Sequence, residues 1–252
     1  MKRIFEALTL FMCIISLTAC DSSMAKEKRL SLTTDQFPVY DFLTNVFSKE
    51  ADVTLVENQN DENVKNADLF VCISSDGFAE NVFEIKKEVE IEGENVFVSP
   101  QKAIDSFFVI YNKIISLDNS LEEKCRDNYD LYVVDLQNIN SKMKSGASGK
   151  SLIIADDINL KILEKDYGFK VKTLNDKTGS VVSVVSEMKK ENNSAVFYIK
   201  GGSNEAATVA GNMTNAYVLP IELCDIKDLR ELRYKISYRK MLDNNAKNFA
   251  MR

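Results

Sequence analysis

The stretch from Asn119 to Lys144, NSLEEKCRDNYDLYVVDLQNINSKMK, predicts a single long helix. Its apolar side chains recur at spacings of three and four, at Tyr129, Tyr132, Val133, Leu136, Ile139 and Met143. The segment Ser145 to Gly149, SGASG, breaks this pattern. Strand and helix patterns alternate on both sides of the long helix. We therefore expect it to join two α/β units.

On the amino-terminal side, short apolar or alternating runs predict strands, and periods of three and four predict helices. Strands are expected at Arg29–Thr34, Val53–Val56, Leu69–Ile73 and Val96–Val98, and helices from Pro38 onward and over Ala103–Leu117. The charged segment Val82–Ile91 fits neither pattern clearly.

On the carboxyl-terminal side, strands are expected at Leu152–Ala155, Lys170–Leu174, Ala195–Ile199 and Tyr217–Leu219. Helices are expected over Asn159–Asp166 (ending at Gly168), Val181–Lys189, Asn204–Met213 and Asp228–Phe249. The predicted fold class is α/β, with two α/β lobes joined by a single long linking helix. The expected boundaries are 29–118 for the first lobe, 119–145 for the linking helix and 149–252 for the second lobe.

Composition narrows the function. The chain has 252 residues, a net charge of −6 and no histidine. An acidic balance argues against a nucleic-acid partner, which needs a concentrated basic face. The missing histidines remove Ser-His and Cys-His catalysis and every imidazole metal site. We expect a monomer that is not an enzyme.

The amino terminus resembles a bacterial lipoprotein signal. Lys2 and Arg3 precede an apolar stretch that is short for a membrane span, and Leu17-Thr-Ala-Cys20 resembles a lipobox. We expect residues 1–19 to be a signal peptide and 20–28 to be a tether acylated at Cys20. The protein would then be extracytoplasmic and lipid-anchored to the cell membrane. The alternative is an ordinary secretion signal with an incidental cysteine.

Three further cysteines remain in the mature chain, Cys72, Cys125 and Cys224. Their odd number and the absence of a CxxC pair favour three small buried side chains. One disulfide and one spare thiol are the alternative.

Several motifs together resemble one family. They are TTDQFPVYDF at Thr33–Phe42, NADLFV at Asn66–Val71, NVFVSP at Asn95–Pro100, EKDYGFKV at Glu164–Val171 and SYRKM at Ser237–Met241. In the same order along the chain, they resemble motifs of the zinc/manganese-type (cluster A-I) substrate-binding lipoproteins of bacterial metal ABC transporters. The resemblance implies capture of one divalent ion, Zn²⁺ or Mn²⁺, between two lobes, for delivery to a permease.

The departures from this family fall at its metal ligands. The segment that carries the first histidine is missing after Val56. The second ligand position falls on Asn95, and the fourth falls on Ile236. The third falls on or beside Asp157, with Asp156 next to it, which makes these two carboxylates the candidate metal ligands. Their alternative role is to cap a helix that starts at Ile158.

These donors suit a weak, hydrated, oxygen-rich site better than a tetrahedral zinc site. Cys72 and Cys224 would supply thiol ligands only if both faced the space between the lobes. Two hypotheses follow. The first is a binding lipoprotein of a metal-type transporter with a degenerate metal site. The second is a retired scaffold that binds a partner protein or a non-metal ligand at the cell surface.

Overall fold

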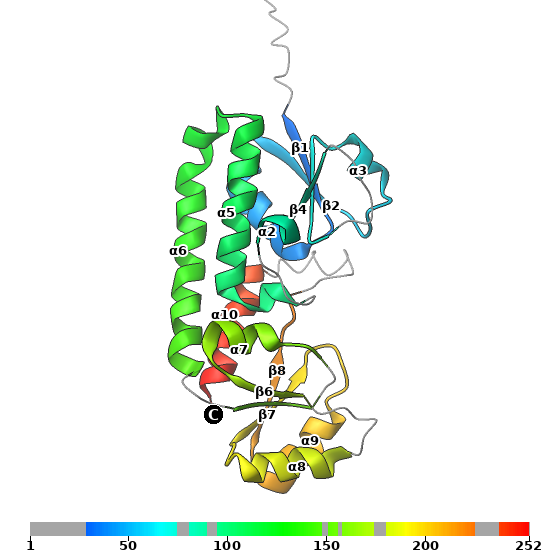
Figure 1. Cartoon of the computed structure of the whole chain (residues 1–252), viewed down its shortest axis with the longest axis vertical. Coiled ribbons are helices and arrows are strands. Elements are labelled where there is room, and N and C mark those ends of the chain that lie inside the picture. Colours follow the sequence, from blue (N-terminus) through cyan, green and yellow to red (C-terminus); the bar gives the residue numbers. More distant parts are fainter. Residues whose placement is uncertain are drawn as a thin grey trace, which may run out of the picture.

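The computed structural model describes residues 29–74, 81–89, 95–147, 151–155, 158–173, 180–224 and 237–251. These residues form two lobes, each built on a four-stranded parallel sheet, with two long helices along one side (Figure 1). The predicted α/β class with two lobes is therefore confirmed. Among the described helices, none has the length and apolar character needed to cross a bilayer.

The amino-terminal sheet has the strand order β2-β1-β3-β4. Its strands are β1 (Leu30–Thr34), β2 (Ala51–Leu55), β3 (Leu69–Cys72) and β4 (Val82–Glu84). The helices of this lobe are α2 (Phe37–Phe47), α3 (Glu62–Asn66), α4 (Ile85–Glu88) and α5 (Pro100–Leu117). The ambiguous segment after residue 81 thus contains both a short strand and a short helix.

The carboxyl-terminal sheet has the strand order β6-β5-β7-β8. Its strands are β5 (Ser151–Ile154), β6 (Lys170–Thr173), β7 (Ala195–Ile199) and β8 (Tyr217–Ile221). The helices are α7 (Lys161–Tyr167), α8 (Ser180–Lys190), α9 (Glu205–Thr214) and α10 (Tyr238–Ala250). The helix α7 ends at Gly168, as predicted, and this glycine adopts a left-handed φ of 71°.

The helix α6 (Leu121–Ala147) runs beside both lobes (Figure 1). Its 27 residues span about 40 Å, enough to reach from one sheet to the other. The side that it buries carries Cys125, Tyr132, Leu136, Ile139 and Met143. Helix α10 packs along α6 and also touches α2 of the first lobe. One hydrophobic core therefore continues through both lobes.

Aromatic rings fill the centre of this core. Phe42 of α2 stacks on Phe107 of α5 with centroids 4.4 Å apart, and Tyr132 of α6 meets Phe42 edge-on at 5.5 Å. Tyr238 of α10 meets Phe107 edge-on at 6.1 Å. Such pairs add specific geometry to area burial, so they fix α10 against the first lobe.

Polar side chains also join the lobes. The Tyr167 hydroxyl donates to Asn140 Oδ1 at 2.8 Å and accepts from the Gln101 backbone N–H at 3.1 Å. Asn140 Nδ2 donates in turn to Gln101 Oε1 at 2.9 Å, and Ser99 Oγ donates to the Asp166 carboxylate. The loop before α5, the long helix and α7 are thereby connected through a network whose members satisfy one another.

Two expectations about elements are wrong. Val96–Val98 is a 3₁₀ helix, η1, and not a strand. Its turn is closed by Ser99 N–H donating to Val96 O at 3.1 Å, and Ser99 is also the N-cap of α5. The helix α10 begins at Tyr238, after Ser237 with an extended ψ of 139°, so a helix continuous over 228–249 is wrong. Residues 228–236 lie outside the described part of the chain.

Candidate functional site

In open parallel α/β sheets, ligands bind outside the carboxyl ends of the strands. The residues that follow β7 and β8 form one such edge in the second lobe. Lys200 follows β7, and Glu222 follows β8, the neighbouring strand in the sheet. The Lys200 backbone N–H donates to Ile221 O at 2.9 Å, which continues the ladder to the end of the strands.

Glu222 is the most unusual residue of this edge. It is 5% exposed, and among the charged residues that the structure describes it is the only buried one. Its Oε1 accepts from Asn244 Nδ2 at 2.8 Å, and its Oε2 lies 3.2 Å from Lys200 Nζ. A buried carboxylate is costly unless it is paired. The amide and the ammonium supply that pairing.

The backbone around Glu222 is also fixed. Asn245 Nδ2 donates to Glu222 O at 2.7 Å, and the Glu222 N–H donates to Asn245 Oδ1 at 2.8 Å. Two residues further on, Cys224 adopts a left-handed φ of 62°, which side chains other than glycine seldom do. After β7, Gly201 makes its turn at φ 92°. Both strand ends therefore leave the sheet in defined conformations.

The strand ends of the first lobe carry amide and carboxylate groups. Asp35, directly after β1, accepts from Gln36 Nε2 at 3.0 Å and from Gln59 Nε2 at 3.3 Å. Gln59 also donates to Ser74 O, beyond the end of β3, at 2.9 Å. The ends of β1 and β3 are thus linked through one glutamine side chain, which brings oxygen and nitrogen groups to the same edge of the sheet.

Asn95 is the predicted ligand position that the structure describes in the first lobe. It is half-buried and precedes η1 as its N-cap residue. Its side chain does not cap that helix, and its backbone carbonyl accepts from the Val98 N–H at 3.3 Å. Two residues later, Phe97 O accepts from the Tyr238 hydroxyl at 2.8 Å. The segment that carries Asn95 is therefore hydrogen-bonded to α10.

The other predicted site residues fall elsewhere. Cys20, Asp156, Asp157 and Ile236 lie outside the described residues. Lipidation of Cys20, metal ligation by Asp156 and Asp157, and the loss of a ligand at Ile236 therefore stay predictions. The alternative role of the two aspartates as a cap before Ile158 is wrong, because α7 begins only at Lys161 with Leu160 as its N-cap.

The two candidate thiols are buried in different places. Cys72 ends β3 and packs in a small apolar cluster with Val56, Val64 and Phe70. Burial raises the pKa of its thiol to about 12, so the thiolate that a metal needs is disfavoured. Cys224 belongs to the main core instead. Cys72, Cys125 and Cys224 are buried and form no disulfide within the described structure, as the first interpretation of the cysteines predicted.

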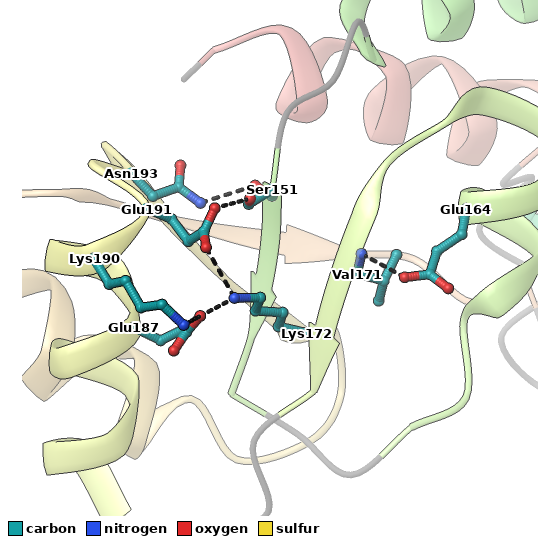
Figure 2. Close-up of polar contacts among 8 residues, drawn as sticks. All are labelled: Ser151, Glu164, Val171, Lys172, Glu187, Lys190, Glu191 and Asn193. Carbon is teal, nitrogen blue, oxygen red and sulfur yellow. Dashed lines mark hydrogen bonds and ion pairs between the residues drawn. The ribbon is translucent and has the colours of Figure 1, made fainter.

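A separate charged cluster lies near the start of β5 (Figure 2). Lys172 of β6 pairs with Glu187 of α8 and lies 2.9 Å from Glu191 Oε1. Ser151 Oγ donates to Glu191 at 2.7 Å, and this bond, followed by the one from Lys172, lowers the pKa of Glu191. Lys190 lies 3.6 Å from Glu187 Oε1, so two lysines balance the two carboxylates, and the cluster joins α8 to the edge of the sheet.

Within the described ranges, no group of three or more cysteine, aspartate and glutamate side chains could hold a metal ion. A cavity of about 530 Å³ lies between α4 and α5, beside Phe108 and Tyr129. A second of about 220 Å³ lies beside α7 and β6, near Leu160 and Val171. Neither is lined by Lys200 or Glu222.

Sequence reasoning missed Lys200 and Glu222. A signal was present, since each is a charged residue directly after an apolar strand. Their pairing depends on the neighbouring positions of β7 and β8 in the sheet, which the sequence pattern does not supply.

Comparisons place these observations among known proteins. The profile of the family described as zinc-uptake complex component A, periplasmic (ZnuA), matches residues 48–251. No curated protein matches the sequence significantly.

Several solved structures share the fold. The metal-dependent lipoprotein YcdH from Bacillus subtilis is 20% identical with a TM-score of 0.72, over 87% of this chain and 97% of its own. The Zn(II)-bound ZnuA-like domain of AdcA from Streptococcus pneumoniae is 16% identical with a TM-score of 0.71, over 89% and 100%. The laminin-binding protein of Streptococcus agalactiae, described as a bifunctional adhesin and metal transporter, is 15% identical with a TM-score of 0.65, over 87% and 99%.

Proposed function

Since the chain belongs to the family of zinc-uptake complex component A proteins, we propose that it is the substrate-binding lipoprotein of a metal-type ABC transporter. It captures a ligand between its two lobes and delivers it to a permease in the membrane. The observation that carries this proposal is the family match, which runs from residue 48, just before β2 of the first lobe, through the long helix and the second lobe. The likeness to solved metal-binding relatives supports the same fold.

The usual metal site of the family is degenerate in this chain. The described residues offer the Asn95 amide before η1, the Asp35 carboxylate after β1, and the Glu222 carboxylate after β8, which is already paired. High zinc affinity comes mainly from imidazole and thiolate ligands. The chain has no histidine, and the Cys72 thiol is held neutral by burial. We therefore propose the family's role as a transporter binding protein, without proposing that zinc is the ligand.

The transporter role is tested by isolating the protein from gently solubilised membranes of its host. We expect a permease subunit and its ATPase to be retained together with it. Retention of neither subunit, under conditions that keep a related transporter intact, would contradict the proposal. The second candidate, a retired scaffold that binds a partner protein, would then be preferred.

The second candidate is favoured by the ion pair at Glu222, because Lys200 already pairs with the one buried carboxylate among the described residues. The laminin-binding relative, whose description combines adhesin and metal-transporting activities, shows that one such scaffold carries both roles. Binding of a host-surface protein by the chelator-stripped protein would support this candidate.

We also propose that the mature protein begins at an acylated Cys20 and is held at the outer surface of the membrane. Radioactive palmitate should label the wild-type protein and leave a Cys20→Ser variant unlabelled. Equal labelling of both proteins would show that the signal is of another kind.

A further inference from the structure

The Glu222 carboxylate has one oxygen that faces a neutral group and one that faces a cation. Asn244, on α10, donates to Oε1, and Lys200 lies 3.2 Å from Oε2. The Glu222 side chain is 6% exposed, whereas the Lys200 side chain is 55% exposed. The ammonium therefore reaches the carboxylate from the solvent side, and a cation that approached Oε2 from solvent would meet it.

We propose that Lys200 is a specificity-determining residue, which excludes divalent cations from Glu222 by acting as a built-in counter-ion. This inference rests on the proposed function, because it assigns the ligand to the carboxyl ends of the strands. A divalent ion at Oε2 would lie beside a positive charge and would have to displace it from a buried partner. Glu222 therefore does not serve as a ligand for a bare divalent cation while Lys200 is in place.

Removal of the lysine should leave the carboxylate in its present position. Glu222 is fixed independently by Asn244 at its side chain and by the two hydrogen bonds between its backbone and Asn245. Lys200 contributes its charge, while the turn that follows is set by Gly201 at φ 92°. A neutral residue at position 200 thus leaves Oε2 without a cation beside it, while the carboxylate keeps its orientation.

The test uses Mn²⁺ as a paramagnetic probe, read by broadening of assigned amide resonances in the purified, chelator-stripped protein. Lys200→Gln, which keeps a donor without its charge, and Lys200→Met should both show broadening centred on residue 222. The Mn²⁺ concentration for half-broadening should fall at least about tenfold below that of the wild type, because a divalent ion no longer faces a like charge.

Two controls identify the cause. Lys200→Arg keeps the positive charge and should behave as the wild type does. Lys200→Gln combined with Glu222→Gln should lose the gain, because the carboxylate is gone. Unchanged amide shifts elsewhere show that each variant is folded.

The proposal is overturned if neither neutral variant gains Mn²⁺ broadening at residue 222, or if the wild type is broadened there as strongly as they are. The Mn²⁺ test and the test of the transporter role can fail independently of each other. Failure of the lysine variants leaves the association with a permease unaffected, whereas loss of that association leaves the charge effect at Glu222 measurable.

Discussion

At the residue scale, polar pairs hold the two lobes together. Tyr132 of α6 donates to Asp41 Oδ2 of α2 at 2.7 Å. Arg239 of α10 lies 4.4 Å above the Tyr132 ring and donates to Asp135 at 2.5 Å and to Asn45 at 3.0 Å. Elements from both halves of the chain thus meet around one tyrosine. A cation above an aromatic ring is also attracted by its face.

Asp41 gives this group a pH dependence. Burial raises the pKa of its carboxyl above 3.8, although the hydrogen bond from Tyr132 and the charge of Arg239 oppose this shift. The folded state therefore holds the proton more tightly than the unfolded state does. The contribution of the Asp41 carboxyl to the free energy of unfolding is fully present below pH 3.8. It is lost as pH rises through the pKa that Asp41 has in the folded state.

We predict that Asp41→Asn removes this dependence, because asparagine does not ionise. From about pH 4 to 7, the free energy of unfolding of the variant relative to the wild type should increase with pH. Urea unfolding at a series of pH values measures the difference. A difference that stays constant over this range would contradict the assignment.

A second prediction concerns the Tyr167 hydroxyl, which bonds Asn140 and Gln101 in the interface between the lobes. Tyr167→Phe leaves buried polar partners without their bond and should cost about 1–3 kcal/mol of unfolding free energy. Tyr217→Phe is the matched control, because Tyr217 is 58% exposed. Equal stability of the two variants in urea would show that the network contributes nothing.

At the element scale, the sequence predicts best those elements whose pattern is local. The long helix follows from apolar residues three and four apart, and the structure places α6 over Leu121–Ala147. The Val96–Val98 error has a tertiary cause. These three residues are buried and apolar, as a strand would be, but the Tyr238 hydroxyl and the cap at Ser99 select a 3₁₀ turn. The Ser99-Pro100 start of α5 is a local pattern, but the contact with Tyr238 is not.

The end of α7 gives a third prediction. Gly168 has a φ of 71°, and a β-carbon there would meet nothing within 4 Å, so only the backbone conformation opposes a side chain. Gly168→Ala should destabilise the fold by about 1–2 kcal/mol. Gly146→Ala, inside α6 with no atom closer than 3.9 Å, should be neutral or stabilising. Thermal unfolding of both variants tests the pair, and a stabilising Gly168→Ala would refute the explanation.

At the scale of the whole molecule, the sequence predicts the two-lobed fold and the family, and the structure and the family match agree. The site is predicted less well. Asn95 is recognised from its motif, but the Lys200–Glu222 pair requires the register of β7 beside β8 and the position of α10. Lys200 and Glu222 are 22 positions apart, and no local sequence pattern indicates that they are in contact. The lobe boundaries at 29–118 and 149–252 stay predictions.

The central claim is that a binding protein of the zinc-uptake family lacks, among its described residues, the donors that hold zinc, and does not bind it. The most direct measurement is the melting temperature of the chelator-stripped protein with and without Zn²⁺ or Mn²⁺. A family-type site at 100 times its Kd adds about 2.7 kcal/mol, roughly 5–10 °C for a chain of this size. We predict a shift below about 1 °C with either ion, a small fraction of that. A rise of 5–10 °C with Zn²⁺ would contradict the account and show a complete metal site.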